Sequence, residues 1–178
     1  MLLSTLLTVS LLAGASIRDV NGQAVNPLEP AGRASILFFI TNDCPIANSY
    51  APEIQRICGE YAGKGMACAL VYSDLSLDVA AIRKHHSEFG YPDTIPAIRD
   101  TGHKLADATG ATITPEAIVV SQGGKVLYRG RIDNLYAALG KPRRQATEHD
   151  LRQALDEVLA QKPVTHPQTP AVGCYIPR

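Results

Sequence analysis

Residues 35–47 read SILFFITNDCPIA, an apolar run that leads into a cysteine and a proline. The continuous apolar run from Ser35 to Thr41 predicts a strand buried on both faces of a sheet. The following segment, Ile46 to Ala62, carries apolar residues at helical spacing. Pro45 suits the first position of that helix, where a missing N–H costs no hydrogen bond. Cys44 is therefore predicted to lie between a buried strand and a helix.

The rest of the chain alternates between predicted strands and helices. The predicted strands are two short ones around Asn21-Gly22 within Ile17–Val25, then Met66–Tyr72, Ala97–Arg99, Glu116–Ser121 and Val126–Arg131. The predicted helices are Leu77–Phe89 with Ser76 as N-cap, Lys104–Thr109, and Thr147–Gln161 with a capping box of Thr147 and Asp150. This order predicts an α/β fold with a central mixed sheet, helices on both faces and an N-terminal β-hairpin extension.

The composition is that of an ordinary globular protein. Hydrophobic residues make up 46% and charged residues 19% of the 178 residues. Lys plus Arg and Asp plus Glu are 17 each, so the formal net charge is zero. A nucleic-acid partner is not expected, because phosphates call for a basic surface.

The two ends of the chain differ from its middle. Residues 1–15 combine an apolar stretch with Ala13-Gly14-Ala15, a pattern typical of a secretory signal peptide, so we expect a periplasmic or secreted protein without stable membrane insertion after processing. A buried N-terminal segment of a cytosolic protein is the alternative. Residues 16–161 form the expected domain. Residues 162–178 contain four prolines and are expected to lie extended on the surface.

Cys44 is the residue on which the predicted chemistry rests. At the start of a helix, unpaired N–H groups and the helix dipole favour the thiolate form of an exposed cysteine, and the thiolate is the nucleophile. Asp43 opposes this effect with a neighbouring negative charge. A buried, inert cysteine is the alternative reading.

Several motifs in this order resemble a known family. Asp43-Cys44-Pro45-Ile46-Ala47, with Pro52 further along, looks like the kinked active-site helix of thioredoxin-like proteins. Thr114-Pro115 looks like the cis-proline site that packs against the active-site sulfur, and Gly123–Gly130 matches the closing hairpin. The resemblance covers about residues 17–161 and points to the redoxin group, which includes peroxiredoxins of the alkyl-hydroperoxide reductase and thiol-specific antioxidant type. It implies that Thr114 and Pro115 belong to the active site.

The chain also departs from each subgroup of that family. Ala47 replaces the second cysteine of thioredoxin-type oxidoreductases, which rules out a C-x-x-C cycle. Thr41 matches the threonine of peroxiredoxins, but Leu37 replaces their proline and Pro115 stands in the place of their arginine. Asn48 replaces the second cysteine of copper chaperones.

Three cysteines remain besides Cys44. Cys58 and Cys68 lie at similar height on a helix and a strand, so a disulfide is conceivable, but two small buried hydrophobic residues are the favoured interpretation. Cys174 lies in the Pro-rich tail, about 13 residues beyond the last helix, a length that can span about 40 Å. It is therefore the predicted resolving thiol for Cys44.

The sequence thus favours a redox enzyme without a metal or other cofactor. All five histidines are interpreted as surface or loop residues, since no set of three or four ligands has metal-site spacing. Arg129 and Arg131 share one strand face, which is expected to be a solvated edge, with pairing of one arginine to an acidic partner as the alternative. The predicted activity is thiol–disulfide exchange or peroxide reduction, with a small-molecule or protein thiol as the redox partner. A copper-binding or redox-partner-binding protein without turnover is the alternative.

Overall fold

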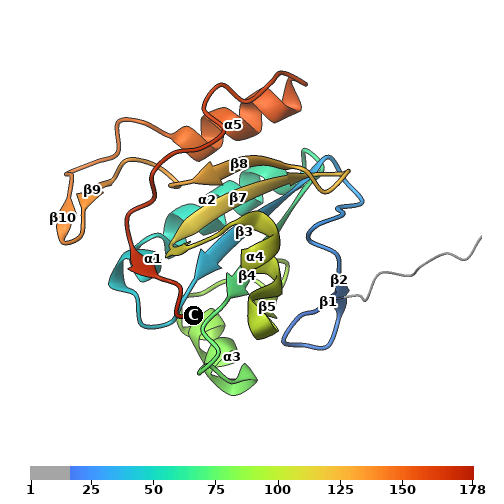
Figure 1. Cartoon of the computed structure of the whole chain (residues 1–178), viewed down its shortest axis with the longest axis vertical. Coiled ribbons are helices and arrows are strands. Elements are labelled where there is room, and N and C mark those ends of the chain that lie inside the picture. Colours follow the sequence, from blue (N-terminus) through green and yellow to red (C-terminus); the bar gives the residue numbers. More distant parts are fainter. Residues whose placement is uncertain (1–16) are drawn as a thin grey trace, which may run out of the picture.

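The computed structural model describes residues 17–178 and has a five-stranded sheet at its centre (Figure 1). The strand order is β5-β4-β3-β7-β8. The strand β4 is parallel to both of its neighbours, β3 and β5, whereas β7 is antiparallel to both of its neighbours, β3 and β8. The bounds are β3 (Ala34–Ile40), β4 (Met66–Tyr72), β5 (Ala97–Arg99), β7 (Glu116–Ser121) and β8 (Val126–Gly130). The predicted α/β fold with a mixed sheet is confirmed.

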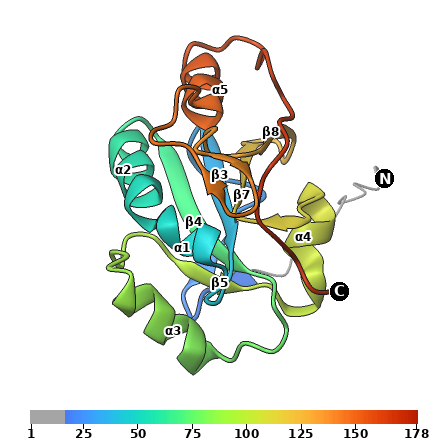
Figure 2. The same cartoon turned by 90° about the vertical axis from the view of Figure 1, so that its left-hand side faces the viewer.

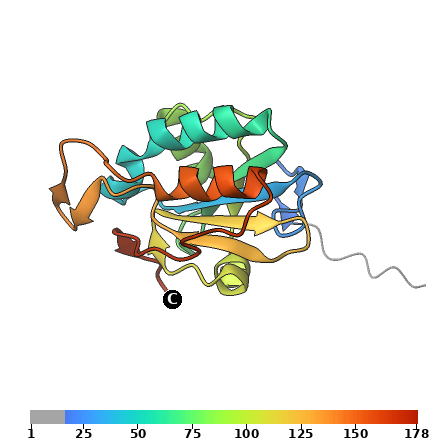
Figure 3. The same cartoon turned by 90° about the horizontal axis from the view of Figure 1, so that it is seen from above.

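Helices cover both faces of this sheet (Figure 3). Their bounds are α1 (Pro45–Ser49), α2 (Ala51–Ala62), α3 (Val79–Glu88), α4 (Lys104–Thr109, after a short 3₁₀ turn at Thr101–His103) and α5 (Asp150–Leu159). Phe38 of β3 packs in one core cluster with residues of α2, α3 and α5, whereas Phe39 packs in a second cluster with α4. All seven residues of β3 are buried, as its apolar run predicts.

The helix predicted after Cys44 is broken into two parts. Tyr50 ends α1 and precedes α2, and its N–H donates to the Ala47 and Asn48 carbonyls. Pro52 follows in the first turn of α2, where its ring and missing N–H prevent a continuous helix. The predicted kink is therefore present as a break.

Two predicted helix starts are wrong. Asp78, not Ser76, caps α3, and its carboxylate accepts from the Ala81 N–H at 2.7 Å. Ser76 instead donates its hydroxyl to Asp74 in the preceding turn. The capping box at Thr147 does not form, because the Thr147 hydroxyl accepts from the Asn134 side chain at 2.9 Å and α5 begins three residues later.

Short two-stranded sheets surround the central one. The predicted N-terminal hairpin is present as β1 (Ile17–Arg18) and β2 (Ala24–Val25). An arm of β9 (Tyr136–Ala138) and β10 (Lys141–Pro142), which the sequence did not predict, projects from the body near α1 (Figure 1).

The C-terminal tail lies extended over the surface, as expected, and backbone hydrogen bonds tie it to the rest of the fold. It runs beside β8, where the Arg129 N–H donates to the Pro167 carbonyl and the Thr169 N–H to the Arg129 carbonyl. It ends in β11 (Cys174–Tyr175), which pairs antiparallel with β6 (Ile113–Thr114) (Figures 1 and 2). Ile176 is then buried in the second core cluster. Backbone pairing and one apolar anchor therefore hold the tail in place.

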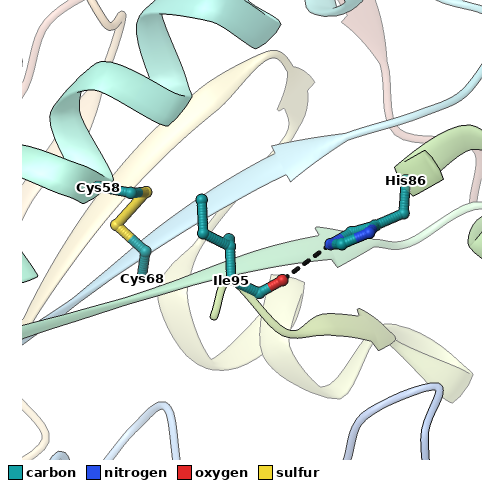
Figure 4. The surroundings of a disulfide bond; sticks show 4 residues. All are labelled: Cys58, Cys68, His86 and Ile95. Carbon is teal, nitrogen blue, oxygen red and sulfur yellow. Dashed lines mark hydrogen bonds between the residues drawn. A yellow bond between two sulfur atoms is a disulfide. The ribbon is translucent and has the colours of Figure 1, made fainter. Parts of the chain in front are cut away.

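Cys58 and Cys68 form a disulfide between α2 and β4, with their Cα atoms 5.7 Å apart (Figure 4). The favoured interpretation of two unlinked hydrophobic residues is wrong. The helix packs directly on the strand here, which brings the two Cα atoms within the separation that a disulfide requires.

Replacing both Cys58 and Cys68 with alanine is expected to lower the free energy of unfolding by about 3 kcal/mol, mainly because the unfolded chain regains the entropy of a closed loop. The cysteines are separated by 10 residues in the sequence. Urea denaturation of the oxidised proteins measures the change. Equal unfolding free energies for the variant and the unmodified protein would contradict a stabilising bond.

Within residues 17–178, no helix has the length and apolar character needed to cross a membrane. The predicted signal peptide, residues 1–15, lies outside the described residues.

Candidate active site

Cys44 lies at the carboxyl end of β3, where the chain turns into α1. It occupies the N-cap position with extended backbone dihedrals, and its side chain makes no capping hydrogen bond. Its relative exposure is 1%, so the expectation of an exposed thiol is wrong. The thiol is covered because two segments from elsewhere in the chain pack over the end of the strand.

The first of these segments is the turn between β6 and β7. The Thr114–Pro115 peptide bond is cis, as predicted. The carbonyl of Thr114 lies 3.3 Å from Cys44 Sγ and accepts its thiol hydrogen. Both Thr114 and Cys44 are buried, so this contact is shielded from water.

The second segment is β11, which brings Cys174 to the same place. Cys174 Sγ lies 2.7 Å from Cys44 Sγ. That distance is longer than a disulfide bond of about 2.05 Å, and both cysteines are free. Cys174 lies opposite Thr114 in the register of β6 and β11. The Thr114 carbonyl also accepts a hydrogen bond from the Cys44 thiol. Because both cysteines lie next to Thr114, their sulfurs come together.

The environment of the two sulfurs makes them unequal. Burial raises the pKa of the Cys174 thiol to about 11, assisted by its hydrogen bond to Cys44 and by the negative charges of Cys44 and Asp43. As a thiol, Cys174 donates to Cys44 Sγ. Cys174 is therefore the sulfur on which this arrangement disfavours a negative charge.

Thr41 and Arg131 bond to acidic side chains. The Thr41 hydroxyl donates to the Asp43 carboxylate at 3.1 Å, which orients the residue before Cys44. Arg131 lines a small cavity with Pro115, but its guanidinium is held by Asp150 and Glu148.

Arg129, two residues before Arg131, has its Nε 3.9 Å from Glu116 Oε1, and its Nη1 donates to the Gly110 carbonyl. Both arginines therefore have acidic partners, as in the alternative to a solvated edge.

The interpretation of all five histidines as surface or loop residues is wrong for His85, which is 4% exposed on the inner face of α3. His103 lies in the turn before α4, as expected of a loop residue, but its side chain is buried. His85 hydrogen-bonds Tyr72 and Asn48, a partner set that helical spacing alone could not reveal. His86 is half-buried and bonds the Ile95 carbonyl (Figure 4). Among residues 17–178, no three His, Cys, Asp or Glu side chains are grouped to hold a metal ion.

Solved structures with this fold include two at 26% sequence identity. A conserved protein from Geobacillus kaustophilus superposes with a TM-score of 0.79 over 92% of this chain and 87% of its own. A hypothetical protein from Sinorhizobium meliloti 1021 superposes with a TM-score of 0.75 over 90% of this chain and 88% of its own. A putative thioredoxin from Neisseria meningitidis, 19% identical, superposes with a TM-score of 0.62 over 82% of this chain and 87% of its own. The thioredoxin-like fold is therefore shown.

One curated relative carries a functional name. It is the thiol-disulfide oxidoreductase ResA of Halalkalibacterium halodurans, which is 22% identical over 111 residues. The match covers 62% of this chain and 61% of that protein. The model of the AhpC/TSA family matches residues 12–129, which include Cys44, Thr114 and Pro115. On that match, which spans most of the chain, the protein belongs to the AhpC/TSA family.

Proposed function

We propose that this protein is a thiol–disulfide oxidoreductase in which Cys44 is the nucleophile and Cys174 the resolving thiol. The 2.7 Å separation of their sulfurs is the observation that carries the proposal. It supplies a second thiol at the site, which Ala47 cannot do. The relative named as a thiol-disulfide oxidoreductase supports the same class of reaction.

The reaction proceeds in two exchanges. The Cys44 thiolate attacks one sulfur of a substrate disulfide, forms a mixed disulfide with it and releases the other substrate sulfur as a thiolate. The Cys174 thiolate then attacks Cys44 Sγ, forms the Cys44–Cys174 disulfide and releases the second substrate thiol. The substrate disulfide gains two electrons and the protein dithiol loses them; an external dithiol returns the protein to its reduced form.

The site supports disulfides better than peroxides as substrates. Reduction of a peroxide needs a donor that stabilises charge on the departing oxygen. Thr41 is engaged by Asp43, and Arg131 is engaged by Asp150 and Glu148. Parallel assays with oxidised glutathione and with hydrogen peroxide test this preference. Faster oxidation of the reduced protein by peroxide than by the disulfide would overturn it.

We further propose that the protein works in the periplasm or outside the cell. The Cys58–Cys68 disulfide supports this, because such bonds persist in oxidising compartments. The apolar N-terminal segment followed by Ala13-Gly14-Ala15 supports it independently. Fractionation of cells producing the protein with a C-terminal tag tests the location; recovery of the unprocessed chain in the cytoplasm would overturn it.

The closing exchange is expected to accelerate about tenfold from pH 7 to pH 8. Burial, the main cause of the raised Cys174 pKa of about 11, persists in the mixed disulfide, so the reactive thiolate fraction grows with pH. Stopped-flow release of thionitrobenzoate from a preformed mixed disulfide on Cys44 measures this rate. A rate that is already constant between these pH values would contradict the high pKa.

A further inference from the structure

A chain of hydrogen bonds connects the buried interior of the protein to the loop that carries Cys44. The Tyr72 hydroxyl lies 2.8 Å from His85 Nδ1, and His85 Nε2 lies 2.9 Å from Asn48 Oδ1. Asn48 Nδ2 then donates to the Asn42 carbonyl at 2.9 Å. The chain crosses from β4 through α3 and α1 to the residues just before the nucleophile. The mechanism proposed above makes no use of it.

Elementary hydrogen-bond chemistry gives this chain one direction. The Asn42 carbonyl can only accept, so the amide nitrogen of Asn48 must face it and the amide oxygen must face His85. His85 therefore carries its proton on Nε2, and its Nδ1 accepts from the Tyr72 hydroxyl. Each of these donors has an acceptor, and the Nε2–H of His85 holds the Asn48 amide in this orientation.

Asn48 holds the Cys44 loop at two points. Its side chain binds the Asn42 carbonyl, and its backbone N–H donates to the Cys44 carbonyl at 3.0 Å. The two bonds bracket Asp43, which is itself exposed. They restrain the backbone on either side of Asp43, and so the position of Cys44 Sγ.

The surroundings of His85 favour its neutral form. Burial lowers its pKa, the charge of Glu88 opposes this and that of His86 reinforces it. The other groups facing the ring are Phe89 and Tyr91 from the end of α3 and the loop after it, Tyr72 from β4, and the Asn48 amide. A second ring proton would meet the Tyr72 hydroxyl, which would then have to give up its role as donor.

We propose that Asn48, oriented by His85, is a positioning residue that keeps Cys44 within reach of Cys174. The inference rests on the proposed function, since it concerns formation of the Cys44–Cys174 disulfide. Its consequence is a high effective concentration of one thiol at the other, which favours the intramolecular disulfide over mixed disulfides with small thiols.

The test compares variants in redox buffers of reduced and oxidised glutathione, far below the unfolding temperature. Asn48→Leu, which keeps the size but removes both side-chain bonds, is expected to lower the equilibrium constant for the Cys44–Cys174 disulfide about tenfold. Asn48→Asp is expected to do the same, because a carboxylate accepts from His85 but cannot donate to the Asn42 carbonyl.

His85 is tested through the same equilibrium. His85→Phe should match Asn48→Leu, and His85→Gln, whose amide can still donate toward Asn48, should restore much of the loss. His86→Asn is the matched control on the same helix; it loses a bond to Ile95 outside the site and should leave the equilibrium unchanged.

The outcomes separate the two proposals. If the unmodified protein forms no Cys44–Cys174 disulfide in these buffers, the proposed function fails and the positioning role fails with it. If that disulfide forms, but its equilibrium constant is the same in the Asn48 and His85 variants as in the unmodified protein, only the positioning role is wrong. Should Asn48→Leu not fold, the comparison of His85→Phe with His85→Gln decides alone.

Discussion

Replacement of Cys174 by serine is expected to stop the reaction after its first exchange and to lower steady-state turnover of a disulfide substrate at least about hundredfold. Cys44 can still attack, but no thiol lies 2.7 Å away to release the mixed disulfide. A serine hydroxyl does not replace it, because it is a far weaker nucleophile at neutral pH. The mixed disulfide should therefore accumulate, and intact-protein mass spectrometry should show one substrate half per chain.

Two controls accompany this variant. Cys44→Ser should abolish even the first exchange. Tyr175→Ala changes the next residue of β11, whose side chain is 82% exposed, and should cycle like the unmodified protein. A Cys174→Ser protein that turns over at the normal rate would show that an external thiol resolves the intermediate.

The second large effect concerns access to Cys44. Gly173→Ala is expected to raise the alkylation rate of Cys44 in the reduced protein at least about tenfold. A Cβ at this position would lie 2.1 Å from the Thr114 carbonyl oxygen and 2.7 Å from its carbon. Both are backbone atoms next to the site, so β11 must shift away from β6. Because β11 carries Cys174 against Cys44, this shift exposes the sulfur.

Gly59→Ala is the matched control, since a Cβ there meets nothing within 4 Å. Labelling with iodoacetamide followed by peptide mass spectrometry measures the rate for each cysteine. If Cys44 reacts equally slowly in Gly173→Ala, Gly59→Ala and the unmodified protein, β11 is not what shields it.

The sheet and its nucleophile could be predicted because local sequence determines them. The apolar run of β3, the Cys44-Pro45 step and the Thr114-Pro115 pair each act over a few residues. Their order along the chain then identified the fold. The predicted bounds of β4, β5, β7 and α4 agree with the structure for the same reason.

The parts that could not be predicted depend on contacts between distant segments. Cys44 was expected to be exposed because nothing local indicates that residues 173–176 pack over it. The prolines of the tail exclude a helix, but they say nothing about backbone pairing with β6 or burial of Ile176. His85 is similar: its helix position does not show that Tyr72 and Asn48 converge on its ring.

Non-reducing peptide mapping of the protein oxidised with one equivalent of oxidised glutathione tests the central claim most directly. All four cysteines are accounted for in a single digest. The account predicts one peptide pair joined by Cys44–Cys174 and a second joined by Cys58–Cys68, with no retained glutathione. Glutathione remaining on Cys44 while Cys174 is a free thiol, or a link from Cys44 to any other cysteine, would contradict it.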